Sequence, residues 1–200
     1  MKLVLKYGGT SISNAKDIQA VSKHVNELSK KHQIVLVCSA TSGTTDDLIE
    51  ISESIKKENK SKAEQLASKI TNRHKQLAKQ TIKKSDVQKK LLIKLNEDFK
   101  ELLALIDGLV LLGEVTSRSM DYLISFGERL SIKLVAAAIN DLTKKSISLT
   151  GKEVGIVTDS NFGESKPLID TTRLRVSKNI DALFSKKTIP VVGGFSGADQ

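Results

Sequence analysis

The sequence predicts an α/β fold with three layers, in which helices cover both faces of a mostly parallel central sheet. Short β-branched runs alternate with longer segments whose apolar residues recur every three or four positions. The run IVLVC at 34–38 is apolar throughout, as expected for a central parallel strand buried on both faces. Three predicted strands end in small or hydroxyl-bearing residues, at the carboxyl ends where open parallel sheets bind ligands.

The predicted elements of the first part of the chain alternate between strand and helix. They are a strand at 2–6, a helix from Ser13 or Asn14 to about residue 30, a strand at 34–38 and a helix that begins at Thr44 or Thr45. Gly8-Gly9 predicts a tight loop after the first strand, and the hydroxyl and amide side chains at the helix starts are typical caps. This alternation favours parallel strand pairing.

The middle of the chain is predicted to be a helical hairpin, at about 60–107, inserted in this frame. Apolar residues in both of its helices recur every three or four positions. Ser85-Asp86 lies between the helices and is expected to cap the second one, whose apolar positions continue to Ile106.

The last part of the chain returns to alternating elements. They are a helix at 117–140, a strand at 146–149, a short strand at Val154–Val157, a helix at Asp170–Phe184 and a strand at Thr188–Val192. The two prolines, Pro167 and Pro190, lie outside the predicted helices, so neither interrupts one.

The composition is that of an ordinary globular protein, with 39% hydrophobic and 28% charged residues. No run approaches the roughly 18 apolar residues that a membrane-spanning helix needs, and the N-terminal apolar run is too short for a secretory signal. The one cysteine, Cys38, cannot form an internal disulfide, and its apolar neighbours predict a small buried side chain. We therefore expect a cytoplasmic protein that does not bind membranes.

The net charge of +9 comes from one segment. Residues 56–100 hold 14 basic and 5 acidic residues, whereas the rest of the chain holds 18 of each kind. Arg73 is the only arginine in this segment, and no aromatic residues alternate with its lysines. The pattern favours the solvated surface of a helical pair, with attraction for a polyanion as the alternative. We expect no nucleic-acid partner.

Small and hydroxyl-bearing residues follow three of the predicted strands. The segments are Lys6-Tyr7-Gly8-Gly9-Thr10-Ser11, Ser39-Ala40-Thr41-Ser42-Gly43-Thr44-Thr45 and Gly193-Gly194-Phe195-Ser196-Gly197. Glycine lets a ligand approach the backbone closely, and hydroxyls add donors. A lysine beside two glycines brings a positive charge and amide dipoles to one place, which suits phosphate. Taken alone, each segment also fits an ordinary turn or helix cap.

The sequence lacks other common catalytic and metal-binding patterns. It contains neither GxxxxGK[ST] nor GxGxxG, and it has no cluster of Cys and His with metal-ligand spacing. We also find no nucleophile elbow and no triad. The three histidines, His24, His32 and His74, are remote from the strand-end segments, and we expect them on helix surfaces.

Gly127 stands in the interior of the helix predicted at 117–140. Glycine there costs about 1 kcal/mol relative to alanine, so we expect a close approach by another backbone or by a ligand to offset the cost. The next residue, Glu128, has a carboxylate that could bind an ammonium group. The alternative is a simple packing contact at Gly127 and an ion pair between Glu128 and a nearby lysine.

Together these segments resemble the successive signatures of the aspartate kinases, within the amino acid kinase superfamily. The matching segments are KYGGTS at 6–11, VCSATSGTTD at 37–46, LLGEVTSRSMDYLISFGERLS at 111–131, VTDSNFG at 157–163 and VVGGFSG at 191–197. They follow the family's order and cover essentially the whole chain. The hairpin is a further likeness, because it separates aspartate kinases from the shorter acetylglutamate, carbamate and uridylate kinases. The resemblance implies an amino acid kinase-like fold.

The resemblance also assigns roles to individual residues. Lys6 matches the catalytic lysine that contacts the transferring phosphoryl group, and Glu128 matches the residue that binds the α-ammonium group of the substrate. The remaining positions are Gly8, Gly9 and Ser39 for the phosphates of ATP, and Thr45, Gly194 and Phe195 for the substrate. Ser196 departs from the family, which usually has an apolar residue there. No metal ligand is assigned.

The activity that the resemblance implies is ATP-dependent phosphorylation of the β-carboxylate of L-aspartate. The product would be 4-phospho-L-aspartate, which enters lysine, threonine and methionine synthesis, and Mg²⁺ would arrive with ATP. The carboxylate has a pKa of about 3.9 and is already ionised at pH 7, so no general base is needed. Positioning and charge neutralisation would carry the transfer. We expect the full-length enzyme to be a homo-oligomer.

The resemblance further implies that residues 1–200 are the amino-acid-binding, N-terminal part of the kinase domain, without the nucleotide-binding half and the regulatory domains. We therefore expect a fragment, or the product of a truncated gene, that is inactive alone. Two alternatives stay open. One is another amino-acid or carboxylate kinase of the superfamily, and the other is a non-catalytic small-molecule-binding or interaction module.

Overall fold

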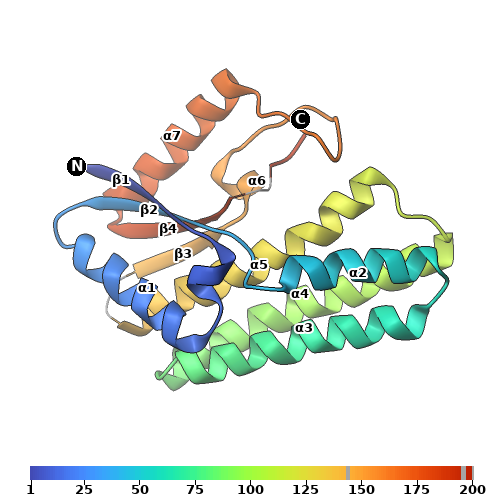
Figure 1. The fold of residues 1–200 in the computed structure, drawn as a ribbon. Helices are drawn as coiled ribbons and strands as arrows, with labels where there is room; N and C mark the ends of the chain where they lie inside the picture. Colours follow the sequence, from blue (N-terminus) through green and yellow to red (C-terminus); the bar gives the residue numbers. More distant parts are fainter. Residues whose placement is uncertain (143–144, 195–196, 200) are drawn as a thin grey trace.

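The computed structural model describes residues 1–142, 145–194 and 197–199. The strands of these residues form one parallel sheet in the order β1-β2-β4-β3. They are β1 (Lys2–Tyr7), β2 (Gln33–Cys38), β3 (Lys145–Leu149) and β4 (Thr188–Gly193). Helices lie on both faces of the sheet (Figure 1). The three-layer α/β fold with a parallel sheet and an inserted hairpin, predicted from the sequence, is therefore confirmed.

The helices are unequally divided between the two faces. The bundle on one face contains α1 (Ala15–Leu28), α2 (Thr44–Lys56), α3 (Lys60–Thr81), α4 (Ser85–Leu112) and α5 (Ser117–Leu142). The other face carries α6 (Gly151–Val154) and α7 (Ile169–Ser185), and a 3-10 turn, η1 (Gly9–Ile12), follows β1. No helix among the described residues is long and apolar enough to span a bilayer.

The central strand β2 is covered on both faces, as its apolar run predicts. Side chains alternate across a strand, so Ile34, Leu36 and Cys38 pack into the core beneath the helical bundle. Val35 faces the opposite way and packs with Val192 of β4 beneath α7. The aliphatic core thus fixes β2 and β4 in the middle of the sheet, and with them the loops at their carboxyl ends.

The edge strand β1 turns its polar side toward α7. Lys2 donates to Asp181 of α7 at 2.7 Å, and its ammonium group lies 5.9 Å from the centre of the Phe184 ring. Lys6 shares this face of β1 because it is four residues further along the strand. Its exposed ammonium group is therefore available on the α7 side of the sheet.

The inserted hairpin consists of α3 and α4, and α4 extends to Leu112, beyond the predicted limit of 107. The prediction that Ser85-Asp86 caps α4 is wrong. Lys84 is the N-cap, and it makes no side-chain hydrogen bond to the helix. Instead, Asp141 at the end of α5 accepts the backbone N–H of Lys84 at 2.7 Å and that of the residue before it. A side chain 57 positions away therefore satisfies the donors at the start of α4.

The strand predicted at Val154–Val157 is also wrong. Val154 is the last residue of the short helix α6. Thr150 and Glu153 form a capping box at the N-terminus of this helix. Among the described contacts of residues 154–157, only Val157 forms a β-bridge, an isolated one with Ala198. The local cap therefore prevails over the β propensity of the valines.

Candidate functional site

The carboxyl ends of β1, β2 and β4 meet at one edge of the sheet. Main-chain hydrogen bonds continue past the strand ends: Ser39 N–H donates to Tyr7 O at 3.2 Å, and Gly194 N–H donates to Cys38 O at 3.2 Å. The loops that follow the three strands therefore begin side by side. This edge is where open parallel sheets bind their ligands.

Gly8 and Gly9 have different surroundings in the first loop. Nothing lies within 4 Å of the point where a Cβ on Gly8 would be, so the backbone there faces open space. A Cβ on Gly9 would lie 2.6 Å from Ala40 O, so Gly9 is needed for packing between the first and second loops. The Lys6 side chain and the backbone at Gly8 are therefore open, whereas Gly9 packs against the second loop.

The second loop runs from Ser39 into α2 and is held at both ends. Ser131 Oγ of α5 donates to Ser39 O at 2.7 Å. Thr44 N–H donates to Thr41 O at 3.0 Å, which closes a tight turn before the first turn of α2. Thr45 follows in that turn and is half-buried. Ser39 and Thr45, the two residues predicted in this segment, thus stand at opposite ends of one loop.

Gly127 allows α5 to touch the second loop. A Cβ on Gly127 would lie 2.8 Å from Ala40 Cβ and 3.4 Å from Leu48 Cδ1. The packing contact considered for this glycine is therefore present, and it is made with the loop that carries Ser39 and Thr45. The close approach brings the next residue, Glu128, to the ends of the strands.

The carboxylate of Glu128 lies where β2 and β4 end, and the residue is only 7% exposed. Its Oε1 atom is 3.9 Å from the point where a Cβ on Gly194 would be. Burial, and to a smaller degree the negative charge of Glu128, raises the pKa of the Cys38 thiol to about 12. At the ends of β2 and β4 the Glu128 carboxylate therefore lies beside a neutral thiol, an arrangement that suits a cationic ligand group.

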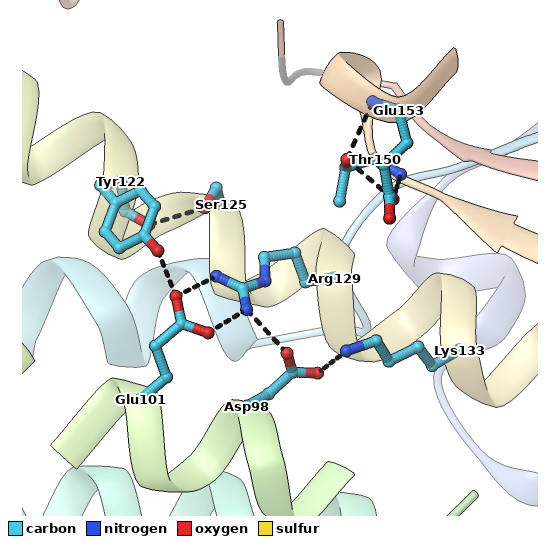
Figure 2. A network of polar contacts seen from close by, with 8 residues as sticks. All are labelled: Asp98, Glu101, Tyr122, Ser125, Arg129, Lys133, Thr150 and Glu153. Atoms are coloured by element: carbon cyan, nitrogen blue, oxygen red, sulfur yellow. Dashed lines mark hydrogen bonds and ion pairs between the residues drawn. The ribbon is translucent and has the colours of Figure 1, made fainter. Parts of the chain in front are cut away.

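Arg129 follows Glu128 but takes part in a different network (Figure 2). Its guanidinium donates to Asp98 of α4 at 2.8 Å and also binds Glu101. Lys133, one turn further along α5, donates to the second oxygen of Asp98. Consecutive residues of a helix point about 100° apart, so these contacts fix the rotation of α5 about its axis. They thereby fix the direction in which Glu128 points.

The segment 157–163 lies against the first turns of α5. Gly163 N–H donates to Asp121 Oδ2 at 2.7 Å, and the Arg118 guanidinium lies 5.2 Å from the centre of the Phe162 ring. This segment, like the second loop, is therefore tied to the helix that carries Glu128.

The third loop is described only in part. Gly194 stands at the end of β4, where a Cβ would lie 3.0 Å from Val37 Cγ1. Phe195, the other residue predicted there, lies outside the described residues, as does Ser196. Of the predicted site residues, the structure brings Gly9, Ser39, Glu128 and Gly194 to adjoining strand ends, with Lys6 and Gly8 at the end of β1.

His74 corrects the expectation that the histidines lie on helix surfaces. His24 is exposed on α1, and His32 is half-buried just before β2, outside the helix. His74 is fully buried, and its Nε2 atom lies 3.2 Å from Thr41 Oγ1 of the second loop. A signal was present in the sequence, because position 74 continues the apolar spacing from Ile70 to Leu77 on α3. Polar residues that reasoning from the sequence missed, Arg73, His74 and Ser131, all contact the second loop.

The family is established by comparison with known proteins. The sequence pattern of the amino acid kinase family matches residues 1–200. This chain belongs to that family, in agreement with the parallel sheet and the loops at its carboxyl edge.

The curated relatives are aspartokinases, which confirms the resemblance seen in the signatures. The Schizosaccharomyces pombe aspartokinase is 32% identical, over 98% of this chain and 38% of its own length. Aspartokinase 3, chloroplastic, from Arabidopsis thaliana is 31% identical, over 97% of this chain and 34% of its own length. The chain thus spans about a third of the length of these relatives.

Solved aspartokinase structures share the fold. E. coli aspartokinase III in complex with aspartate and ADP superposes with a TM-score of 0.85 at 18% identity, over 100% of this chain and 42% of that chain. The complex of the same protein with lysine and aspartate gives the same TM-score, over 98% of this chain and 41% of that chain.

Proposed function

We propose that this chain provides the amino-acid-binding residues and the phosphate-binding lysine of an aspartate kinase. The observation that carries the proposal is the position of Glu128, a buried carboxylate at the point where β2 and β4 end and the loops of the site converge. The names of the curated relatives support the same activity. So does the fold shared with a structure that contains aspartate and ADP.

Glu128 would bind the α-ammonium group of aspartate. A buried carboxylate gains most from a cationic partner because the low-dielectric surroundings strengthen their attraction. Thr45, at the far end of the second loop, would help to hold the substrate, and Gly194, whose backbone lies close to Glu128, would contact it. Phe195 would border the substrate. These contacts would orient the β-carboxylate toward the end of β1.

Lys6 and Gly8 would hold the phosphoryl group that is transferred. A carboxylate oxygen of aspartate attacks the γ-phosphorus of ATP, a new P–O bond forms, and the bond to the bridging oxygen breaks to release ADP. The attacking carboxylate is already ionised at pH 7, so the chain needs no general base. Its contribution is to align the reactants and to neutralise negative charge with Lys6 and the open backbone of Gly8.

Mg²⁺ would accompany ATP, since the phosphates supply oxygen ligands for it. Ser39, whose backbone is fixed by Tyr7 and Ser131, would lie near the γ-phosphate. The product, 4-phospho-L-aspartate, is an acyl phosphate that feeds lysine, threonine and methionine synthesis. Nucleotide recognition beyond the phosphates is assigned to none of the described residues.

The first test is ligand-observed NMR of L-aspartate with the 200-residue chain. We expect binding to aspartate in preference to glutamate, because the additional methylene group would displace one carboxylate. Glu128→Gln removes the negative charge without changing the shape of the side chain, and it should abolish the binding. Glu97→Gln, an equal change of charge at an exposed position of α4, should leave the binding intact.

The outcomes separate the possible functions. Preferential binding of another amino acid that still depends on Glu128 would indicate a different amino acid or carboxylate kinase of the family. If a folded chain binds no amino acid, or if binding is unaffected by Glu128→Gln, the assignment of this site is wrong. Salt-dependent binding of a polyanion by the lysine-rich hairpin would instead support an interaction module.

A further inference from the structure

Two buried hydroxyl groups form the inner side of the second loop. Thr41 is 2% exposed and Thr44 is fully buried, and their Oγ1 atoms are 2.7 Å apart. They lie between Ser39 and Thr45, the two loop residues assigned to ATP and substrate. Most buried hydroxyls in proteins are hydrogen-bonded, and the partners of this pair determine how the loop is held.

The first partner is His74 of α3, from the inserted hairpin. Its Nδ1 atom lies 2.8 Å from Ile70 O, and a carbonyl oxygen can only accept, so Nδ1 carries the proton. Burial lowers the pKa of His74 to about 4, so the ring is neutral at pH 7 and Nε2 carries no proton. Nε2 is therefore an acceptor. The Thr41 hydroxyl, 3.2 Å away, must donate to it.

The direction of the remaining bonds follows from this one. Because the Thr41 proton is directed to His74, Thr44 must donate across the 2.7 Å contact to Thr41 Oγ1. Thr44 Oγ1 can then accept from Arg73 Nη2, which lies 2.9 Å away. The result is one directed chain of hydrogen bonds from Arg73 through Thr44 and Thr41 to His74, and from His74 to Ile70 O.

The chain of hydrogen bonds is anchored at its charged end. Arg73 Nη2 also donates to Asp47 Oδ2 at 2.9 Å, and Lys69 donates to Asp47 Oδ1 at 2.7 Å. The side chain of Asp47 is 6% exposed, so these two cations of α3 neutralise a buried carboxylate in the first turn of α2. The hairpin therefore holds both the buried face of the loop and the start of the helix that carries Thr45.

We propose that Arg73 and His74 are positioning residues for the substrate loop, residues 39–45, and that the inserted hairpin thereby sets the geometry of the amino-acid site. This inference rests on the proposed function. The loop has little freedom elsewhere, since Ala40 is packed closely against Gly9 and Gly127. A change at the buried hydroxyls therefore moves the loop as a unit, and small displacements of binding groups lower affinity.

The test uses a matched pair of substitutions in the complete 200-residue chain. Thr41→Val removes the hydroxyl and keeps the volume. Thr81→Val is the control, because Thr81 is also 2% exposed, lies on α3, and its hydroxyl has no partner among the described residues. We expect the Kd for aspartate to rise about tenfold in Thr41→Val, the loss of about one buried hydrogen bond, and to stay within about twofold in Thr81→Val.

Variants of His74 give an independent test. The amide of Gln reaches the position of Nε2, so His74→Gln should retain near-normal affinity, whereas His74→Leu should resemble Thr41→Val. The double variant Thr41→Val/His74→Leu should lose no more aspartate affinity than either single variant, because both substitutions break the same chain of hydrogen bonds. The proposal would be overturned by equal losses of aspartate affinity in Thr41→Val and Thr81→Val, or by additive losses of affinity in the double variant.

The ring nitrogens of His74 provide a measurement that does not depend on aspartate. In ¹⁵N NMR of the unaltered chain at pH 7, we expect Nδ1 to be protonated and Nε2 to be unprotonated, with the Nε2 signal shifted in Thr41→Val. The opposite tautomer would contradict the directed chain. If aspartate fails to bind while the ring spectrum is as expected, the proposed function is wrong and the hydrogen-bond chain stands.

Discussion

The carboxylate of Asp98 on α4 binds the guanidinium of Arg129 on α5 at 2.8 Å, and Arg129 directly follows Glu128 in the sequence. The hairpin therefore reaches the candidate site in two places. Asp98 holds the helix that carries Glu128, and His74 holds the loop that carries Thr45. Both contacts are with buried polar groups, whose loss leaves a partner unsatisfied.

Asp98→Ala should lower the free energy of unfolding by about 3 kcal/mol, because Lys133 loses its buried anion and Arg129 keeps only the more exposed Glu101. Urea denaturation measures this change. Glu53→Ala, which breaks the exposed pair between Glu53 and Lys56, is the control and should shift the urea midpoint far less. Equal shifts in the two variants would show that the Asp98 network contributes no more than a surface ion pair.

Gly127→Ala should destabilise the chain, although alanine is the better helix former. The new Cβ would lie 2.8 Å from Ala40 Cβ, and overpacking of this kind costs about 1–3 kcal/mol. Gly108→Ala is the matched control, because Gly108 is inside α4 with nothing within 4 Å of its Cβ position. There the substitution should stabilise by up to about 1 kcal/mol. Thermal unfolding should therefore show a lower melting temperature for Gly127→Ala and a higher one for Gly108→Ala.

Gly8→Ala and Gly9→Ala should separate ligand binding from folding. Gly8 has φ −76°, which alanine adopts readily, and its Cβ would face open space, so this variant should fold normally but bind ATP more weakly. In Gly9→Ala the Cβ would meet a backbone carbonyl at 2.6 Å, so stability should fall. Circular dichroism melts measure the stability of both variants, and nucleotide titrations measure their affinity for ATP. Normal stability of Gly9→Ala would contradict the packing role.

Lys6→Ala should lower turnover much more than it lowers aspartate affinity, because the ammonium group neutralises the transferring phosphoryl group. The measurement is steady-state kinetics in an enzyme that also contains a nucleotide-binding region. Lys2→Ala, on the same face of β1 but paired with Asp181, is the control and should retain activity. Unchanged turnover in Lys6→Ala would show that Lys6 does not act on the transferring phosphoryl group.

Stability should fall with acid between pH 6.5 and about 4 because of His74. Burial first, and then the charge of Arg73, lowers its pKa from the ordinary 6.5 to about 4. In this window the unfolded chain binds a proton that the folded chain does not, so the free energy of unfolding decreases as the pH falls, by about 3 kcal/mol in all. Above pH 6.5 His74 is neutral in both the folded and the unfolded chain, so it no longer changes the free energy of unfolding. Urea denaturation at about pH 7 and pH 4.5 should show a smaller decrease in His74→Gln.

Much of the fold could be predicted because its signals are local. The apolar run at 34–38 indicates a strand covered on both faces, and Ile34 and Val35 do face opposite cores. The helical spacing of apolar residues likewise predicts α3, α4 and α5. The wrong predictions concern ends and short elements, such as the cap of α4, where Asp141 supplies the contact from a distant part of the chain.

The sequence by itself determined the order of the elements, the parallel sheet and the strand-end segments that carry Lys6, Ser39 and Gly194, since residue period and turn chemistry act over a few neighbouring positions. Only the tertiary structure decided that Gly9 packs while Gly8 stays open, and that His74 lies beneath the loop rather than on a surface. The physical reason is that these environments come from partners remote in the chain. Thr41 meets His74 across 33 positions, and Ser39 meets Ser131 across 92.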